Sequence, residues 1–386
     1  MARSLLARYT RCTVFTRAFK LVVALVVALP LASALPGGAA LAADPVKLTV
    51  GYQPYDTISY SAAVIRGLEL WKKHLPAGTE VEFQQALQGS IIVNQMLANK
   101  QQIGYLGDMP AVVATTKRQQ SVIKLVANTG FSPGQRCNVI MVRVDAPQFA
   151  SPQEAVRWLD GKTIATPKGS CADRFLGDVI ERTKIKPAAI LNQSLEVLST
   201  NLRTKKIDGA VLWEPTASRI GNIVGEGIAR YVATGNAFNI PDSGYIAMRE
   251  DFLQQQPAIA EAWLKTELEA QRFILNPANA TKVAQIVKDQ TTGITVQMAW
   301  FSLYGAIPTA AGGSSTRDEK PFVFEERVHS QLATIYRFLH QSKVIDVDKA
   351  PQGALDDSIA RKVAKLANAS LPLGIIKAQD VAQAPK

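Results

Sequence analysis

The sequence predicts an α/β fold built on doubly wound sheets, and two observations support this prediction. Segments typical of strands and helices alternate through residues 44–127 in the order strand, helix, strand, helix, strand, helix, strand. A second alternating series begins about a hundred residues further along the chain. Parallel strands need a helical connection to bring the chain back, so this alternation is typical of a doubly wound sheet.

The first series contains four strands and three helices. Thr57 and Ser90 are expected to cap the first two helices, because a side-chain oxygen at that position accepts a free backbone N–H. The third helix follows the turn Gly107-Asp108-Met109-Pro110, where proline near a helix start costs no hydrogen bond. The expected elements are strand 44–52, helix 57–71, strand 80–86, helix 90–97, strand 103–106, helix 110–117 and strand 122–127.

The second series follows a break at residues 131–136, which we expect to be a crossover. Its first helix begins with a capping box that has proline at the first helical position, Ser151-Pro152-Gln153-Glu154. The expected elements are strand 138–144, helix 151–161, strand 162–166, a helix after the turn 167–171, strand 189–191, helix 194–204, and a strand within 206–215 that leads into another turn and helix.

The rest of the chain is expected to return to the first half and to become mainly helical. Strands 231–233 and 245–248 flank a loop at 235–243, and helices are expected at 257–275, 281–289 and 324–340. Residues 312–315 read as a flexible loop. The tail after Leu371 has little periodicity, so we expect it to fray.

The first 43 residues have the pattern of a signal peptide. Residues 1–20 carry five basic side chains and no acidic one, residues 21–29 form an apolar run, and small residues follow to Ala42-Ala43. A basic segment, a short apolar core and a small-residue cleavage site are the parts of a secretory signal. We expect cleavage near Ala42 and Ala43 and a soluble exported chain. An uncleaved N-terminal anchor is the alternative, although the apolar run is short for a membrane span.

The charge of the chain disfavours nucleic acid as a partner. Five of the eleven excess positive charges lie in the signal, which leaves about +6 on the mature chain. No block of Lys and Arg and no alternation of basic with aromatic residues is present in the sequence. A mild positive surplus fits an anionic ligand without requiring one.

The cysteines suggest a disulfide. Cys12 precedes the apolar run, so it is not a lipidation site, and the mature chain keeps Cys137 and Cys171. Two cysteines in an exported chain suggest a bridge, and the absence of C-x-x-C spacing argues against a redox or zinc motif. The alternative is that Cys171 is a free thiol in a ligand site. No metal or cofactor is expected, and the three scattered histidines are assigned no chemistry.

Three segments resemble motifs of the periplasmic substrate-binding proteins of ABC transporters in the nitrate/sulfonate/taurine family. They are MLANKQQIGYLGDMP at 96–110, LDGKTIATPKGS at 159–170 and DGAVLWEP at 208–215. Asn99 or Lys100 stands where the family has glycine, and Gln102 stands where it has aspartate, but the Gly107-Asp108 turn is intact. The likeness spans about residues 47–275, and the three motifs occur in the family's order.

The resemblance implies a two-lobed periplasmic binding protein fold of type II, with two doubly wound sheets joined by two hinge strands. Lobe 1 would comprise residues 44–134 and 234–386, and lobe 2 residues 135–233. The protein would be a periplasmic monomer that closes on a small anionic or zwitterionic ligand and delivers it to an ABC permease in the inner membrane. A ligand that touches both lobes favours the closed form because it binds that form better.

The expected site residues lie at strand ends that precede helices, where α/β proteins bind ligands. They are Gln53, Tyr55, Gly89, Ser90, Gly107 and Asp108 in the first lobe, and Gly169, Ser170, Cys171, Trp213 and Glu214 in the second.

Each of these residues has an expected role. Ser170, with the N–H groups of Cys171 and Ala172, is expected to form an anion-binding helix start. Lys168 or Arg136 would add a charge-assisted bond.

Trp213 would form a wall of the pocket. Asp108 and Glu214 would hold an ammonium group, which favours a zwitterion such as taurine. The alternatives are a core role for Trp213, a helix-capping role for Asp108 and a surface ion pair for Glu214.

Three other functions compete with this one. The fold resembles that of yeast-type pyrimidine synthases, but their C-C-C-F-C cluster is missing here, as are G-x-S-x-G, H-E-x-x-H and a Walker loop. We therefore do not expect an enzyme. A sensor whose closed lobes bind a receptor, and a carrier of a larger aromatic acid or pyrimidine, remain open alternatives.

Overall fold

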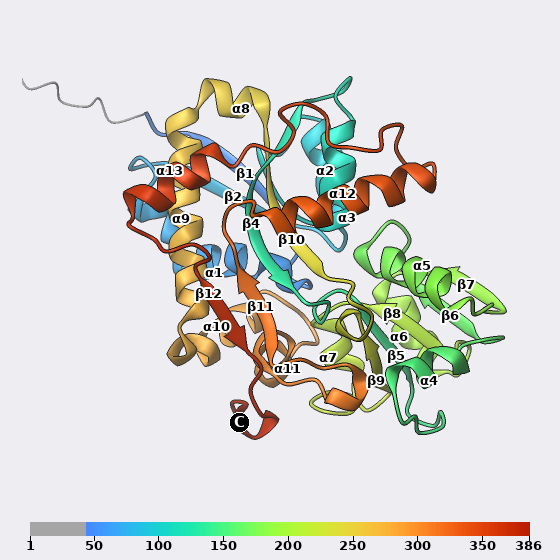
Figure 1. Ribbon diagram of the computed structural model, residues 1–386. Helices are drawn as coiled ribbons and strands as arrows, with labels where there is room; N and C mark the ends of the chain where they lie inside the picture. The colour runs from blue at the N-terminus through green and yellow to red at the C-terminus, as the bar shows by residue number, and fades with distance from the viewer. Residues whose placement is uncertain (1–43) are drawn as a thin grey trace, which may run out of the picture. The chain divides into compact units, whose positions relative to one another are not determined.

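Two mixed sheets organise residues 44–386, the part of the chain that the computed structural model describes (Figure 1). The expected signal peptide, its cleavage near Ala42–Ala43 and Cys12 lie outside these residues. We call the part built on the seven-stranded sheet lobe 1 and the part built on the five-stranded sheet lobe 2. Residues 44–386 belong to one compact unit, so contacts between the two lobes can be described.

The strands of the two sheets follow the same spatial order. Lobe 1 runs β2-β1-β3-β10-β4, extended by β11 and β12, and lobe 2 runs β7-β6-β8-β5-β9. The first three strands of each series are parallel, and the fourth is antiparallel to its neighbours. The strands of lobe 1 are β1 Lys47–Tyr52, β2 Glu80–Gln85, β3 Ile103–Gly107, β4 Ile123–Ser132, β10 Asp242–Arg249, β11 Thr316–Lys320 and β12 Gly374–Lys377. Those of lobe 2 are β5 Val139–Arg143, β6 Thr163–Thr166, β7 Ala189–Asn192, β8 Gly209–Leu212 and β9 Ala229–Thr234.

Helices cover both sheets. Those of lobe 1 are α1 Tyr60–Leu68, α2 Gly89–Leu97, α3 Asp108–Thr116, α8 Glu250–Gln255, α9 Pro257–Leu275, α10 Ala280–Lys288, α11 Val296–Tyr304, α12 Glu326–Gln341 and α13 Ser358–Leu366. Those of lobe 2 are α4 Pro152–Trp158, α5 Cys171–Thr183, α6 Leu195–Arg203 and α7 Thr216–Ile220. No helix within residues 44–386 is long and apolar enough to span a bilayer.

Two connections link the lobes, at residues 133–138 and 235–241. Each leads directly into the antiparallel strand of the other lobe, β5 or β10. The connections also touch each other, because the N–H of Gly235 donates to the carbonyls of Gly134 and Asn138, both at 2.8 Å. Gly134 has φ +104°, and a Cβ there would lie 2.4 Å from the Ile240 carbonyl oxygen, so only glycine fits. The predicted lobe boundaries lie beside these connections, and whether the lobes move as separate bodies stays a prediction.

The structure corrects several expectations about individual elements. Helix α2 begins at Gly89 with Gln88 at the N-cap, so Ser90 is not the cap. Asp56, not Thr57, caps the first helical turn, a 3₁₀ helix at Thr57–Ser59 that precedes α1. The tail after Leu371 does not simply fray, because β12 pairs with β11. The elements α8, α11, α13 and β11 were not predicted.

Candidate ligand-binding site

A pocket lies between the lobes, where the strands of both end. Atoms leave about 380 Å³ of space in it, counting the open mouth, but the centre of a water molecule has only about 30 Å³ in which to move. The pocket is therefore small. It is lined by Gln53, Asp56, Gln88, Gly89, Ser90, Gly107, Pro110, Pro167, Lys168, Gly169, Ser170, Cys171 and Trp213.

Eight of the eleven expected site residues lie at this pocket. They are Gln53, Gly89, Ser90, Gly107, Gly169, Ser170, Cys171 and Trp213. Their contact with a ligand stays a prediction. Tyr55, Asp108 and Glu214 do not line the pocket, and each is held elsewhere by partners far away in the sequence.

Three helices begin at the pocket. Their N-cap residues are Gln88 for α2, Gly107 for α3 and Ser170 for α5. The first N–H groups of a helix have no partner within the helix, and the helix dipole is positive at that end. Neither Gln88 nor Gly107 makes a side-chain cap. The three helix starts therefore surround the pocket with N–H donors suited to an anion.

The Ser170 hydroxyl forms hydrogen bonds with the loop before α5 and with the first turn of that helix. Its hydroxyl donates to the Pro167 carbonyl at 2.6 Å and accepts from the Asp173 N–H at 3.2 Å. The N–H of Gly169, which has φ +76°, donates to Asp173 Oδ2 at 2.9 Å. With the hydroxyl engaged in both directions, the N–H groups of Cys171 and Ala172 are the donors that α5 offers a ligand.

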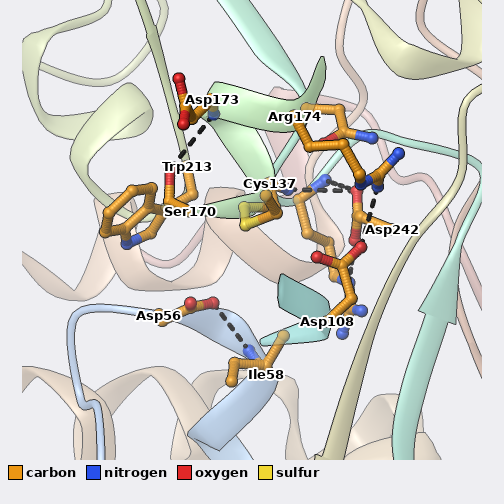
Figure 2. Close-up of a disulfide and its surroundings, with 12 residues drawn as sticks. Asp56, Ile58, Asp108, Cys137, Ser170, Asp173, Arg174, Trp213 and Asp242 are labelled. Atoms are coloured by element: carbon orange, nitrogen blue, oxygen red, sulfur yellow. Dashed lines mark hydrogen bonds and ion pairs between the residues drawn. A yellow bond between two sulfur atoms is a disulfide. The ribbon is translucent and has the colours of Figure 1, made fainter. Parts of the chain in front are cut away.

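A disulfide forms part of the pocket wall. Cys137 and Cys171 are joined, with their Cα atoms 6.0 Å apart (Figure 2). Cys171 is the first residue of α5 and lines the pocket, whereas Cys137 lies within the first connection between the lobes. The N–H of Cys137 donates to Asp242 Oδ2 at 3.1 Å. The bridge therefore ties the start of α5 to the connection, and Cys171 is not a free thiol here.

Asp108 is part of a buried ion pair between the lobes, so the expectation that it binds a ligand needs correction. Its Oδ2 accepts from Arg174 Nη2 at 2.8 Å, and both side chains are buried (Figure 2). Gln331 Nε2 lies 3.4 Å from the same oxygen. Burial raises the pKa of Asp108, and the Arg174 guanidinium acts against that rise. The helix cap is Gly107, so Asp108 is not the cap either.

Glu214 is also held inside the protein. Tyr231 Oη donates to its Oε1 at 2.8 Å, the Ser218 N–H donates to its Oε2 at 2.9 Å, and Arg317 Nη2 lies 3.6 Å from Oε1. Burial raises the pKa of Glu214, and these partners oppose the rise. Neither the expected ammonium site nor the alternative of a surface ion pair is found at this residue.

Trp213 closes one side of the pocket and links the lobes. Its Nε1 donates to the Tyr55 carbonyl at 3.0 Å, and only 3% of its surface is exposed. The hydroxyl of Tyr55 is engaged with Thr292 instead, whose N–H donates to it at 2.6 Å. Tyr55 therefore contributes a backbone carbonyl to the contact between the lobes, and its ring is anchored away from the pocket.

The two basic residues considered for a ligand bond differ in position. Lys168 is exposed and lines the pocket. Arg136 is fully buried, with its Nε 3.2 Å from Asp242 Oδ1 and its Nη1 3.3 Å from Asp318 Oδ1. Arg136 therefore belongs to the charge network beside the first connection.

Four further residues line the pocket that were not predicted from the sequence, namely Asp56, Gln88, Pro110 and Pro167. The sequence around Asp56 could have indicated its capping role, because aspartate is a preferred N-cap and Asp56 directly precedes Thr57, the residue expected to cap the helix. No local sequence feature indicates that Pro110 lines the pocket, because its position there depends on close packing against Gly89. A Cβ added to Gly89 would lie 2.5 Å from Pro110 Cγ.

The close contact between Gly89 and Pro110 leads to a prediction. Gly89→Ala is expected to lower the free energy of unfolding by about 1–3 kcal/mol, because the new methyl group forces α2 away from α3. Gly107→Ala is the matched control, since its Cβ would meet only Cys171 Sγ, at 4.0 Å. We expect that control to change stability by less than about 0.5 kcal/mol in denaturant unfolding. Equal stability of the two variants would contradict the packing described here.

The model of the NMT1-like family matches residues 42–288, well over half of the chain. The chain belongs to the NMT1-like family. Its fold is the two-lobed, type II periplasmic binding protein fold that the motif resemblance implied, and that expectation is confirmed.

Individual relatives of this NMT1-like protein agree with the resemblance. The taurine-binding periplasmic protein of Escherichia coli K12 is 25% identical over 241 residues, which cover 62% of this chain and 70% of that protein. The alkanesulfonate-binding protein SsuA of Xanthomonas axonopodis pv. citri, solved with MOPS bound, superposes with a TM-score of 0.62 and 17% identity over 81% of this chain and 99% of that one. The nitrate-binding protein NrtA of Synechocystis PCC 6803 gives a TM-score of 0.64 and 13% identity over 84% and 89%.

Proposed function

We propose that this protein is the periplasmic solute-binding component of an ABC importer. It captures a small sulfonate-like anion or zwitterion, of the taurine, alkanesulfonate and nitrate class, and delivers it as a monomer to an inner-membrane permease. The observation that carries the proposal is the convergence of three helix starts from two lobes on one small pocket. Oriented N–H groups in such a place suit a compact oxyanion. The taurine-binding relative from Escherichia coli supports the same class of ligand.

Closure of the lobes is the physical basis of capture. The Asp108–Arg174 ion pair and the bond from Trp213 to the Tyr55 carbonyl both join lobe 1 to lobe 2. A ligand held by α2 and α3 on one side and α5 on the other binds best when these contacts are made. It therefore shifts the population toward the closed form, which a permease can recognise.

The contents of the pocket favour binding over catalysis. Its cysteine is engaged in the disulfide, the Ser170 hydroxyl is engaged in both directions, and no histidine is among the residues that line it. A nucleophile needs an adjacent base to be activated, and among the described residues that line the pocket no serine is hydrogen-bonded to Asp56 or Lys168. We therefore propose a carrier and not an enzyme.

The small free volume favours a short ligand over an aromatic acid or a pyrimidine. The centre of a water molecule has about 30 Å³ in which to move, so the pocket has room for only a few ligand atoms unless the lobes open. The Xanthomonas relative was solved with MOPS, a sulfonate that carries a ring, so a larger sulfonate is the second candidate. A panel of ligands of different size distinguishes a short sulfonate from a larger one.

A thermal-shift panel on the mature chain tests the proposed function. A ligand that binds only the native state at a hundred times its Kd adds about 2.7 kcal/mol, which corresponds to a rise in Tm of about 4 °C for a chain of this length. We expect that rise with taurine or a short alkanesulfonate. Ser90→Trp is expected to abolish it, because Ser90 is exposed at the pocket and a large side chain there fills it.

Ser330→Trp is the control for that variant, because Ser330 is exposed on α12 away from the pocket. It is expected to keep the full shift. A response to aromatic acids together with silence toward sulfonates, nitrate and bicarbonate would discard the proposed ligand class. A shift that survives in Ser90→Trp would place the ligand elsewhere.

A further inference from the structure

Asp56 is the acidic side chain among the residues that line the pocket. Asp108 and Glu214, the two carboxylates expected to hold an ammonium group, face buried partners instead. Asp56 lies on the loop after β1 and retains only 4% of its surface exposed. Figure 2 shows it across the gap from Ser170 and Trp213 of lobe 2. The pocket therefore combines a carboxyl group from one lobe with a helix start from the other.

The carboxyl group of Asp56 is fixed in place by the fold. Its Oδ1 accepts from the Ile58 N–H at 3.1 Å and so caps the first helical turn (Figure 2). Within residues 44–386, this is the hydrogen bond that its side chain makes, so the other carboxyl oxygen of this pocket-lining residue has no hydrogen-bond partner there. A buried carboxylate that is held rigidly, with one oxygen unused, discriminates strongly between a cationic and an apolar group placed beside it.

The remaining donors of the pocket suit the opposite charge. The start of α5 offers the N–H groups of Cys171 and Ala172, and the start of α2 offers those of Gly89 and Ser90. A ligand that satisfies both sides carries an anionic group for the helix starts and an ammonium group for Asp56. An anion of the same size with a methyl group in place of the ammonium group would put that apolar methyl group beside the Asp56 carboxylate.

We propose that Asp56 is the residue that selects the ligand by charge pattern, binding the ammonium group of a small aminosulfonate and disfavouring a plain sulfonate of equal length. This inference rests on the proposed function, and it names the substrate class within it. Taurine and 1-propanesulfonate are the matched probes, because a methyl group in the second replaces the ammonium group of the first.

The selection should depend on pH. Burial raises the pKa of Asp56 to about 7, with Arg136 acting against the rise and Asp242 and Asp108 adding to it. These three groups are buried, and Lys168 is the exposed charge at the pocket. Above this pKa the carboxylate favours taurine. Below it the neutral acid loses its attraction for the ammonium group and can donate to a sulfonate.

The test measures the Kd of both probes by calorimetry at about pH 5.5 and about pH 8, a range in which the sulfonate stays ionised. In the wild-type protein, taurine should bind about tenfold or more tightly than 1-propanesulfonate at the higher pH, as expected for a charge-assisted bond. That preference should shrink at the lower pH. Asp56→Asn should remove both the preference and its pH dependence, and the amide oxygen keeps the cap on Ile58.

Asp160→Asn is the control, because Asp160 is an exposed carboxylate of lobe 2 outside the pocket. It should behave as the wild type. If wild type and Asp56→Asn show the same preference at both pH values, the assignment of Asp56 is overturned and the proposed function stands. If neither probe binds the folded wild type at either pH, this inference is overturned, and the thermal-shift panel with nitrate, bicarbonate and larger sulfonates decides the proposed function separately.

Discussion

Arg174→Met is expected to lower the free energy of unfolding by about 3 kcal/mol near neutral pH. The change leaves the Asp108 carboxylate buried without its closest counter-charge, with Gln331 Nε2 3.4 Å away and the Met109 N–H and Arg136 as the other groups that favour its charge. Removal of one partner from a buried ion pair typically costs about 3–5 kcal/mol, because the other charge is left uncompensated. We expect the lower end of that range, since a buried carboxyl group can take up a proton. Denaturant unfolding, followed by circular dichroism, measures the loss.

The loss in Arg174→Met should depend on pH in a defined direction. Burial already raises the pKa of Asp108 above its unfolded value of 3.8, and removal of the guanidinium raises it further. A group whose pKa is higher in the folded state than in the unfolded state stabilises the protein at low pH and loses that contribution as pH rises. The penalty should therefore be small near pH 4 and full near pH 8.

Two controls make this prediction specific. Arg182→Met changes an exposed arginine on the same helix, so its effect should stay within about 0.5 kcal/mol. In the double variant Asp108→Asn/Arg174→Met, neither charge of the pair remains, so its loss should be at least about 1 kcal/mol smaller than the sum of the two single losses. Strict additivity would mean that the two side chains do not interact in solution.

The variant Cys137→Ala/Cys171→Ala is expected to lose about 4 kcal/mol of stability. The disulfide closes a loop with a sequence separation of 34 residues. The loop-entropy relation gives about 3 kcal/mol for a 15-residue loop and about 4.7 kcal/mol for a 100-residue loop, so this loop falls between them. Affinity for the ligand should fall as well, because the bridge fixes the start of α5 at the pocket.

A reductant separates the bridge from the mutations themselves. Treatment with a phosphine reductant should destabilise the wild-type mature chain by a similar amount and leave the double-alanine variant unchanged. Cys137 and Cys171 are the two cysteines within residues 44–386, so a thiol assay on those residues as an unfolded, unreduced chain reports directly on the bridge. Two titratable thiols in that assay would show that the bridge does not form.

The sequence predicted the parts of the fold that depend on local pattern. Helix α9 was placed at Pro257–Leu275, its observed bounds, because proline marks its start and apolar residues recur at helical spacing. Strand β3 was predicted as a short buried strand at residues 103–106, and every residue of the observed strand is buried. The motifs also pointed to strand ends that border the pocket, which is why eight of the eleven expected site residues line it, and their contact with a ligand stays a prediction.

Strand β11 shows where local pattern fails. Four of its five residues are charged, which by hydropathy suggests a surface loop. Yet Arg317, Asp318 and Lys320 are buried, and Asp318 lies 2.7 Å from Lys320 Nζ and 3.3 Å from Arg136 Nη1. Burial of such residues depends on counter-charges that come from another part of the chain. The sequence pattern alone cannot bring those partners together.

Periodicity and short motifs were sufficient to predict the fold class, the family and the strand ends at which a ligand would be sought. Which carboxylate lines the pocket is seen only in the folded protein. Asp56 and Asp108 both sit between a strand and a helix, and nothing local distinguishes them. Arg174, 66 residues beyond Asp108, takes up the carboxylate of Asp108 and leaves Asp56 at the pocket. Pairing of buried charges acts across space, whereas a motif records only neighbours in the chain.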